Sequence, residues 1–429
     1  MDTSALDPNH RSTAPVIPLF GRRRMNSFRL TLPPLPLLGT PNYYALAAIT
    51  LFLAVFGLLM VLSASSVEQG QSTGNPYADF GKQATALFLG VGAMLLVSRA
   101  KPRLLLTVAP FVFGGAVLLQ LVTVLTSLGT TVNGNRNWIR IAGFSVQPSE
   151  FVKLGLVLLI AAIFTRRKAE RQSVLGLAPV IIAAAIAVGS VMIGHDLGTA
   201  LIIGVIVFGG LFFAGVRLPV IAVLGVASAG VFALLAIAGG SRIERITAWG
   251  GAGCNGDLLG TCWQSQQATW ALANGGVFGV GIGNSVSKWF WLPEAENDFI
   301  LAIIGEETGL IGLTVLLALF VALTVVALRI FTGSGDRFTR AVTGMTLVWL
   351  VGQAFANIAV VLGIAPVFGV PLPFISSGGS SMIANLLAVG CVLALANART
   401  PEPAPPVQPG RLTGRDRPVA AAPMPGRPS

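Results

Sequence analysis

A carboxylate, Asp298, stands where a polar segment ends and an apolar stretch begins at Phe299. A carboxylate at a membrane boundary is within reach of water and of a substrate anchored in lipid, which suits a general base acting on such a substrate. The same position suits a helix N-cap, where a side-chain oxygen accepts a hydrogen bond from a free backbone N–H group. Spacing alone leaves both interpretations of Asp298 open.

Other ionisable side chains lie within apolar stretches, where each one costs about 2.5–3.5 kcal/mol at mid-membrane unless it is paired or faces a cavity. Glu150 and Lys153 are three residues apart, so they share one helix face and can neutralise each other. They form either a structural ion pair near a site or part of the chemistry itself. Asp79 and Lys82 repeat the spacing and are expected to be structural.

Two further carboxylates have structural and functional interpretations. Asp196 begins another apolar stretch and is either a helix cap or a functional group. Glu306 follows Asp298 by eight residues, about two helical turns or 12 Å along a helix axis. That depth separates it from proton transfer at Asp298, so Glu306, with its neighbour Glu307, is expected to bond to a neighbouring helix or to line a cavity.

The composition indicates which kind of protein holds these ionisable side chains in place. The 429 residues are 54% hydrophobic and 10% charged, with a mean hydropathy of +0.78, which is typical of a polytopic membrane protein. A span needs about 20 apolar residues. The sequence therefore predicts an all-α membrane domain over 43–398 with about ten transmembrane helices, at 43–64, 79–98, 104–126, 148–165, 175–194, 197–215, 218–239, 299–328, 339–363 and 379–397.

The net charge of +11 follows membrane topology and does not indicate a nucleic-acid partner. Most Lys and Arg residues gather in segments that lie on one side if both termini are cytoplasmic. The opposite side then includes a large external loop, 240–298, between the seventh and eighth helices. Residues 1–42 and 399–429 are rich in Pro and Arg without apolar periodicity, which predicts disordered cytoplasmic tails.

The external segments carry two cysteines and two basic pairs. Cys254 and Cys262 lie where oxidation is permitted, so we expect a disulfide between them, with two free thiols as the alternative. The basic pairs suit bidentate binding of a pyrophosphate, although ordinary lipid headgroups also attract arginine. These pairs are Arg136 with Arg140 and Arg242 with Arg245. No Cys/His cluster has metal-ligand spacing, so no resident metal is expected.

Five motifs in order resemble one family, the SEDS (FtsW/RodA) proteins of shape, elongation, division and sporulation, over roughly residues 43–398. They are Asn-Gly-Asn-Arg-Asn-Trp-Ile at 133–139, Gln-Pro-Ser-Glu at 147–150 with Lys153, Asp-Leu-Gly-Thr-Ala at 196–200, Asn-Asp-Phe-Ile at 297–300 with Gly-Glu-Glu at 305–307, and Pro-Leu-Pro-Phe-Ile-Ser at 371–376 with Gly-Gly-Ser-Ser at 378–381. The last motif adds Ser380 to the candidate site residues.

The resemblance implies a ten-helix fold and a peptidoglycan glycosyltransferase that polymerises lipid II, with Asp298 as the essential catalytic residue and Glu150 and Lys153 bearing on activity. It implies a class B penicillin-binding protein as transpeptidase partner, other membrane proteins of division, and a divalent cation (Mg or Mn) as an optional companion of the substrate pyrophosphate. The paired-cysteine loop is similar to division-type members of high-GC Gram-positive bacteria, which implies a septal location in the cell membrane.

Three other functions stay open: an elongation-type polymerase, a lipid II flippase and a non-catalytic scaffold of the division machinery. The chain also departs from the family pattern at three positions. Glu296 stands where many members carry His, His195 where Pro commonly precedes the aspartate, and Ser377 where Tyr is common. A second carboxylate two residues from Asp298 is expected to raise the pKa of Asp298 if the two side chains converge.

Overall fold

The computed structural model describes residues 40–132, 134–141, 143–166, 173, 175–237, 249 and 263–397. The predicted disulfide of Cys254 and Cys262, the pair Arg242 and Arg245, and the two predicted tails apart from residues 40–42 lie outside the described residues. The helices are α1 (Pro41–Ser72), α2 (Ala78–Val97), α3 (Pro102–Leu125), α4 (Pro148–Arg166), α5 (Ala178–Met192), α6 (Leu197–Phe213), α7 (Leu218–Ile237), α9 (Trp263–Gly275), α10 (Ile300–Gly333), α11 (Arg337–Val361) and α12 (Gly379–Asn397), with a short 3-10 turn at Leu175–Leu177 before α5.

The predicted all-α polytopic membrane class is confirmed, because every one of the ten predicted ranges coincides with a helix. Within the described residues, eight helices are long and apolar enough to cross a membrane, and α6 and α7 are shorter apolar helices. The number of crossings and the side of each terminus stay predictions. Several predicted ends differ, since α1 continues to Ser72 and α10 to Gly333. At its start, α1 includes Pro41 and Asn42, since Thr40 caps that helix by accepting a hydrogen bond from the N–H of Tyr43 and Pro41 suits the first turn.

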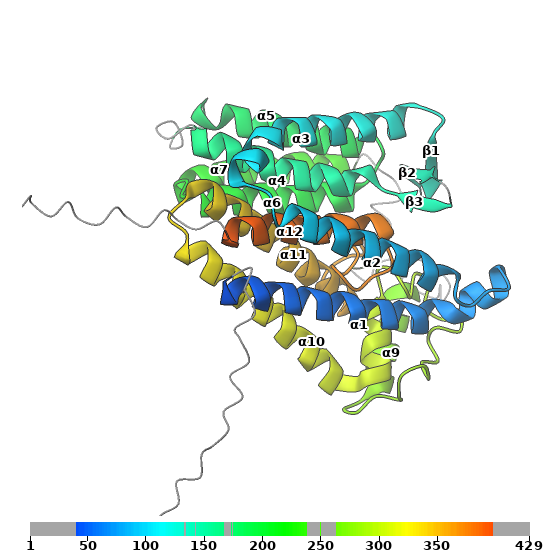
Figure 1. The fold of residues 1–429 in the computed structure, drawn as a ribbon. Helices are drawn as coiled ribbons and strands as arrows, with labels where there is room; N and C mark the ends of the chain where they lie inside the picture. Colours follow the sequence, from blue (N-terminus) through cyan, green and yellow to red (C-terminus); the bar gives the residue numbers. More distant parts are fainter. Residues whose placement is uncertain are drawn as a thin grey trace, which may run out of the picture. The chain divides into compact units, whose positions relative to one another are not determined.

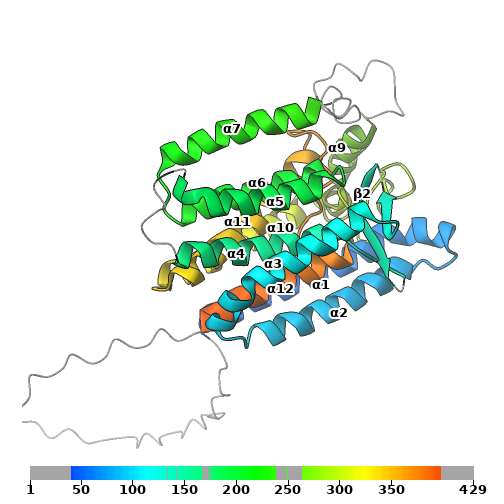
Figure 2. The same cartoon turned by 90° about the horizontal axis from the view of Figure 1, so that it is seen from above.

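The helices lie side by side, with α4 and α12 as the most enclosed spans (Figures 1 and 2). The helix pair α3 and α4 and the pair α2 and α12 pack along much of their lengths, and α11 packs against α6, α10 and α4. The charged side chains at the start of α4, Glu150 and Lys153, are tolerated because they form an ion pair inside the bundle. The core helices therefore provide a rigid frame for residues at their ends.

A small antiparallel sheet lies between α3 and α4 and was not predicted. Its strands are β1 (Gly129–Val132), β2 (Asn135–Ile141) and β3 (Phe144–Val146), in the order β1-β2-β3. The sheet, the end of α1 and α9 lie toward the same end of the bundle (Figures 1 and 2). The N–H of Arg136 donates to the carbonyl of Gly194 at 2.9 Å, so β2 is fixed to the turn that precedes α6.

Helix α10 is interrupted at Gly309, whose φ of 67° and ψ of −167° are not helical. The segment after α9 fills the break, because the N–H of Leu310 donates to the carbonyl of Gly276 at 3.0 Å and the N–H of Val280 donates to that of Glu306 at 2.9 Å. A side chain at Gly309 would meet the backbone of Val277 and Gly279. This break joins the segment 276–288 to the span that begins beside Asp298.

Candidate active site

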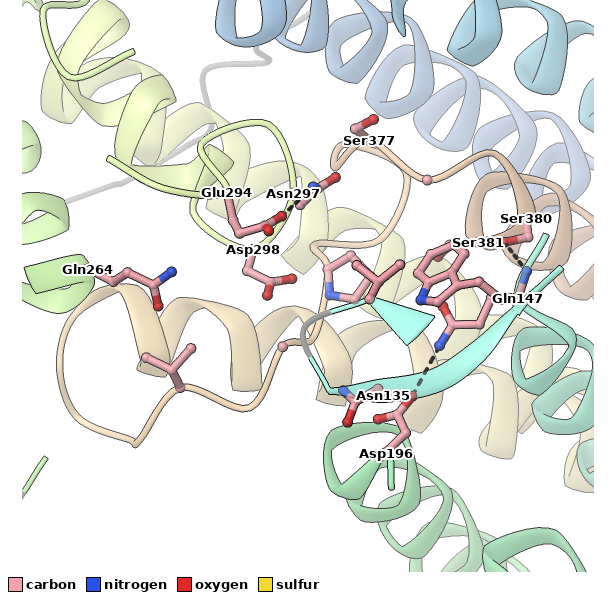
Figure 3. Close-up of a pocket in the computed structure, with 16 residues that line it drawn as sticks. Asn135, Gln147, Asp196, Gln264, Glu294, Asn297, Asp298, Ser377, Ser380 and Ser381 are labelled. Atoms are coloured by element: carbon pink, nitrogen blue, oxygen red, sulfur yellow. Dashed lines mark hydrogen bonds between the residues drawn. The ribbon is translucent and has the colours of Figure 1, made fainter. Parts of the chain in front are cut away.

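A pocket opens at the end of the bundle that carries the sheet, and it collects residues from segments far apart in the sequence. Its space, the open mouth included, amounts to about 960 Å³. Its lining residues come from the starts of α6, α9 and α12, from the sheet and the residue before α4, and from the loops before α10 and after α11. They are Val132, Asn135, Trp138, Gln147, Asp196, Gln264, Glu294, Asn297, Asp298, Val367, Gly369, Pro371, Ser377, Gly378, Ser380 and Ser381 (Figure 3).

Asp298 lies in the turn before α10, half-buried, and lines this pocket (Figure 3). The N-cap of α10 is Phe299, and that position has no side-chain capping bond. Asp298 thus lies one residue before the N-cap position of this helix. Gly369 has a φ of 70°, and a Cβ atom there would lie 3.6 Å from Asp298 Oδ2. The bare backbone at Gly369 thus forms the wall opposite the carboxylate.

The turn that carries Asp298 is held in place through its backbone. Ser376 Oγ donates to the carbonyl of Asn297 at 2.6 Å, and the N–H of Ser377 donates to the carbonyl of Glu296 at 2.8 Å. Inside the turn, Asn297 Nδ2 donates to Glu294 Oε2 at 2.7 Å. The loop after α11 therefore fixes the height of Asp298 relative to the pocket.

Asp196 and Ser380 form the other side of the pocket with Gln147. Asp196 caps α6, since its Oδ1 accepts from the N–H of Thr199 at 2.9 Å, and its Oδ2 accepts from Gln147 Nε2 at 3.1 Å. Ser380 Oγ accepts from the N–H of Gln147 at 3.1 Å. The capping interpretation of Asp196 is thus confirmed. The same carboxylate also lines the pocket, so the two interpretations do not exclude each other.

Glu150 and Lys153 form an ion pair behind the pocket. Lys153 Nζ lies 2.9 Å from Glu150 Oε1, and both side chains are 2% exposed. Neither residue lines the pocket. Lys153 Nζ also donates to Gln353 Oε1 at 3.0 Å, and Gln353 Nε2 donates to the carbonyl of Pro371, a lining residue, at 2.8 Å. The structural ion pair near the site is therefore the interpretation that the geometry supports.

Glu306 and Glu307 lie away from the pocket and bond to α9 and the segment after it, as expected for carboxylates that bond to a neighbouring element. Glu306 accepts from Asn274 Nδ2 at 2.8 Å and from Ser285 Oγ at 2.5 Å. Glu307 Oε1 lies 3.3 Å from Lys288 Nζ. Lys288 is buried with this carboxylate partner, which the sequence did not predict.

The structure does not bring Arg136 or Arg140 to the pocket. Arg136 Nη2 donates to the carbonyl of Thr126 at the end of α3 at 2.6 Å, and Arg140 is exposed on β2. Arg242 and Arg245 lie outside the described residues. The described lining thus contains the carboxylates Asp196, Glu294 and Asp298 and no Lys or Arg. In the part of the chain that the structure describes, no group of three or more His, Cys, Asp or Glu residues has a geometry that holds a metal ion.

Glu296 differs from the other acids of the turn because it is buried, with 9% of its surface exposed. Burial raises its pKa to about 7, and repulsion from Glu68 and, more weakly, from Glu294 and Asp79 adds to the increase. Its Oε2 atom is buried without a hydrogen-bond partner. The pKa of Glu296 is thus raised by burial and by acids of other elements, Glu68 of α1 and Asp79 of α2, as well as by Glu294.

The arrangement as a whole is a half-buried carboxylate in a polar pocket rich in amides and hydroxyls. The amide and hydroxyl groups of Asn135, Gln264, Asn297, Ser377 and Ser381 were not among the predicted site residues. Asn135, Asn297 and Ser381 lie inside the family-like motifs at 133–139, 297–300 and 378–381, which was a usable sequence signal for a site residue. Gln264 and Ser377 lie outside these motifs. Such a pocket suits a ligand with several hydroxyl groups and a proton acceptor beside it.

Comparisons with known proteins agree with this geometry. The FtsW/RodA/SpoVE family model, described as "Cell cycle protein", matches residues 44–400. The probable peptidoglycan glycosyltransferase FtsW of Mycobacterium tuberculosis is 37% identical over 369 residues, which cover 85% of this chain and 70% of that protein.

Two solved structures have the same fold. The structure described as "Structural coordination of polymerization and crosslinking by a peptidoglycan synthase complex" matches with a TM-score of 0.66 and 25% identity, covering 82% of this chain and 97% of the other. The rod shape determining protein RodA of Thermus thermophilus matches with a TM-score of 0.62 and 24% identity, covering 83% and 98%. The chain belongs to the FtsW/RodA/SpoVE family of membrane proteins.

Proposed function

We propose that this protein is a peptidoglycan glycosyltransferase that polymerises lipid II, with Asp298 as its general base. The observation that carries the proposal is the position of Asp298, which lies just before a membrane span and half-buried in the lining of a pocket rich in amides and hydroxyls. The FtsW relative, which is similar over most of the chain and is named for this activity, supports the reaction class.

In the proposed reaction, the Asp298 carboxylate takes the proton from the 4-hydroxyl group of the acceptor GlcNAc. The oxygen attacks C1 of the donor MurNAc, and the bond from C1 to the pyrophosphate oxygen breaks. The products are a β-1,4 linkage, a free undecaprenyl pyrophosphate and a protonated Asp298, which then loses its proton to water. The amide and hydroxyl groups of the pocket orient the sugars, and the apolar helices hold the lipid chains.

The leaving pyrophosphate needs positive charge that the described lining does not carry. Arg242 and Arg245, or a divalent cation that arrives with the substrate, supply that charge in the proposal, since Arg136 and Arg140 do not line the pocket. Chelation with EDTA separates the two sources. Loss of polymerisation that Mg or Mn restores assigns the charge to a cation, whereas full activity in EDTA assigns it to arginine.

We propose a class B penicillin-binding protein as the partner that crosslinks the strands, because the matching complex structure is described as coordinating polymerisation and crosslinking. The similarity to an FtsW of 37% identity favours septal wall synthesis in division over elongation. Depletion of the protein in growing cells tests this choice. Filaments with unfinished septa support the division role, and round cells contradict it.

Purified protein in proteoliposomes with lipid II tests the reaction. Asp298→Asn is expected to abolish glycan polymer, while Asp336→Asn, a matched change at the carboxylate that caps α11 outside the pocket, leaves it unchanged. Transfer of lipid II across the bilayer without any polymer supports the flippase alternative. Normal division of cells that contain only the Asp298→Asn variant supports the scaffold alternative.

A further inference from the structure

Three polar side chains of α11 are buried on one face of that helix, at intervals of four residues. Trp349, Gln353 and Asn357 each have 0% of their surface exposed. Side chains four residues apart lie one above the other along a helix. Buried amides are unfavourable unless they form hydrogen bonds, so the partners of Gln353 and Asn357 indicate what the row of side chains does.

Gln353 connects the ion pair behind the pocket to the pocket wall. Its Oε1 accepts from Lys153 Nζ and from Trp349 Nε1, both at 3.0 Å, which fixes the orientation of the amide. Its Nε2 then faces the carbonyl of Pro371 and donates to it at 2.8 Å. The buried charge of Lys153 thus determines which end of the amide points to the pocket.

Asn357, one turn further along, joins the turn of Asp298 to the adjacent 369–371 segment. Its Nδ2 donates to the carbonyl of Asp298 at 2.7 Å and to the carbonyl of Val370 at 2.8 Å. Its Oδ1 is buried and has no hydrogen-bond partner, so the side chain acts only as a donor. One amide group therefore ties the residue that carries the proposed base to that segment.

The contact with Asn357 adds a bond from α11 to the turn that precedes α10. The carbonyl of Phe299 accepts from the N–H of Ala302 at 2.9 Å, and Asp298 lies one residue earlier. The carbonyl of Asp298 accepts from Asn357 of α11. A packed helix gives a fixed reference that a loop lacks, and α11 packs against α4, α6 and α10.

We propose that Asn357 and Gln353 are positioning residues, which set the distance and orientation between Asp298 and the 369–371 wall. The inference rests on the proposed function, since it matters for turnover only if Asp298 reacts. It assigns a role to two neutral side chains that do not line the pocket. It also gives the ion pair of Glu150 and Lys153 a physical link to catalysis, because Lys153 orients Gln353.

The test compares Asn357→Ala, Asn357→Ser and Gln353→Glu with Thr346→Val in purified protein. Asn357→Ser keeps one donor, and Gln353→Glu keeps the acceptor for Lys153 while losing the donor to Pro371. Thr346 is the matched control, since it is a buried polar residue of the same helix whose Oγ1 has no partner. Lipid II turnover gives kcat and KM, and monodisperse elution shows that each variant is folded.

A misplacement of about 1 Å costs roughly 100-fold in rate, so Asn357→Ala is expected to lose about 30- to 100-fold in kcat with KM changed less than about 3-fold. Asn357→Ser and Gln353→Glu are expected to lie between Asn357→Ala and the wild type, and Thr346→Val to equal the wild type. A folded Asn357→Ala protein with wild-type kcat, or a loss confined to KM, overturns the proposal.

Hydrogen exchange of the backbone gives a second measurement that does not depend on activity. In the Asp298→Asn background, adding Asn357→Ala is expected to speed exchange in 294–300 and 369–372, with no change in α4. Unchanged exchange there refutes the positioning role even if activity falls. If Asp298→Asn alone stays active, the proposed general base is refuted, while faster exchange still shows that Asn357 holds the turn.

Discussion

Replacement of Glu296 by Gln is predicted to change how stability depends on pH. The pKa of Glu296 is raised from 4.5 to about 7 by burial and by nearby acids, first Glu68. Since one pKa unit corresponds to about 1.36 kcal/mol, ionising Glu296 in the folded protein disfavours folding by about 3 kcal/mol. Gln is neutral, and its amide N–H groups can donate to the surrounding carboxylates.

The sign follows from proton binding in the two states. Below the unfolded pKa of 4.5, both states hold the proton and Glu296 has no effect on the free energy of unfolding. Between 4.5 and about 7, the folded state keeps a proton that the unfolded state releases, so stability falls as pH rises. Above about 7 the full loss is present. Glu296→Gln is therefore expected to be the more stable protein at pH about 8 and equal to the wild type at pH about 4.

Thermal melting of the purified protein in lipid nanodiscs, followed by tryptophan fluorescence across this pH range, measures the effect. Glu296→Ala serves as a control, because it removes the carboxyl group without adding a donor. Both variants are expected to lose the part of the pH slope that Glu296 contributes, although their absolute stabilities differ. A wild-type slope that persists unchanged in both variants refutes the assignment of a raised pKa to Glu296.

Two further substitutions test the buried contacts. Lys153→Met leaves Glu150 buried and unpaired, so it is expected to destabilise the protein by about 3–5 kcal/mol. Adding Glu150→Gln is expected to recover much of the melting temperature. Equal melting temperatures of the single and double variants would contradict this prediction. Gly309→Ala places a Cβ atom against the backbone of Val277 at a φ of 67°, so the free energy of unfolding is expected to fall by more than about 1 kcal/mol. An increase in the free energy of unfolding would contradict this prediction.

The spans were predictable because a bilayer demands about 20 consecutive apolar residues, a signal that does not depend on tertiary contacts. The sheet at 129–146 was not predictable in the same way, since its strands are short and their residues mix polar and apolar types. Helix α9 was missed for a similar reason. Its sequence, WQSQQATWALANG, has no continuous apolar run, and the helix is stabilised by packing on α10.

The site was only partly predictable. Asp298, Asp196 and Ser380 were recognised from motifs, and the structure brings all three to one pocket, which no spacing along the chain reveals. Gln353 and Asn357 were not predicted because they carry no charge, and the sequence signal used for functional residues in membrane spans was an ionisable side chain. A neutral amide inside an apolar helix also needs a partner when it is buried, so both amides were a usable signal. Which carbonyls they would reach depends on the loops around α11.

The most direct test is the rate of lipid II polymerisation by the purified protein with the proposed transpeptidase partner, wild type against Asp298→Asn. The amide keeps the size and polar shape of the side chain but does not accept a proton at neutral pH. A folded Asp298→Asn protein that still binds lipid II is expected to form no measurable glycan polymer. Glycan strands formed by that variant at the wild-type rate would contradict it.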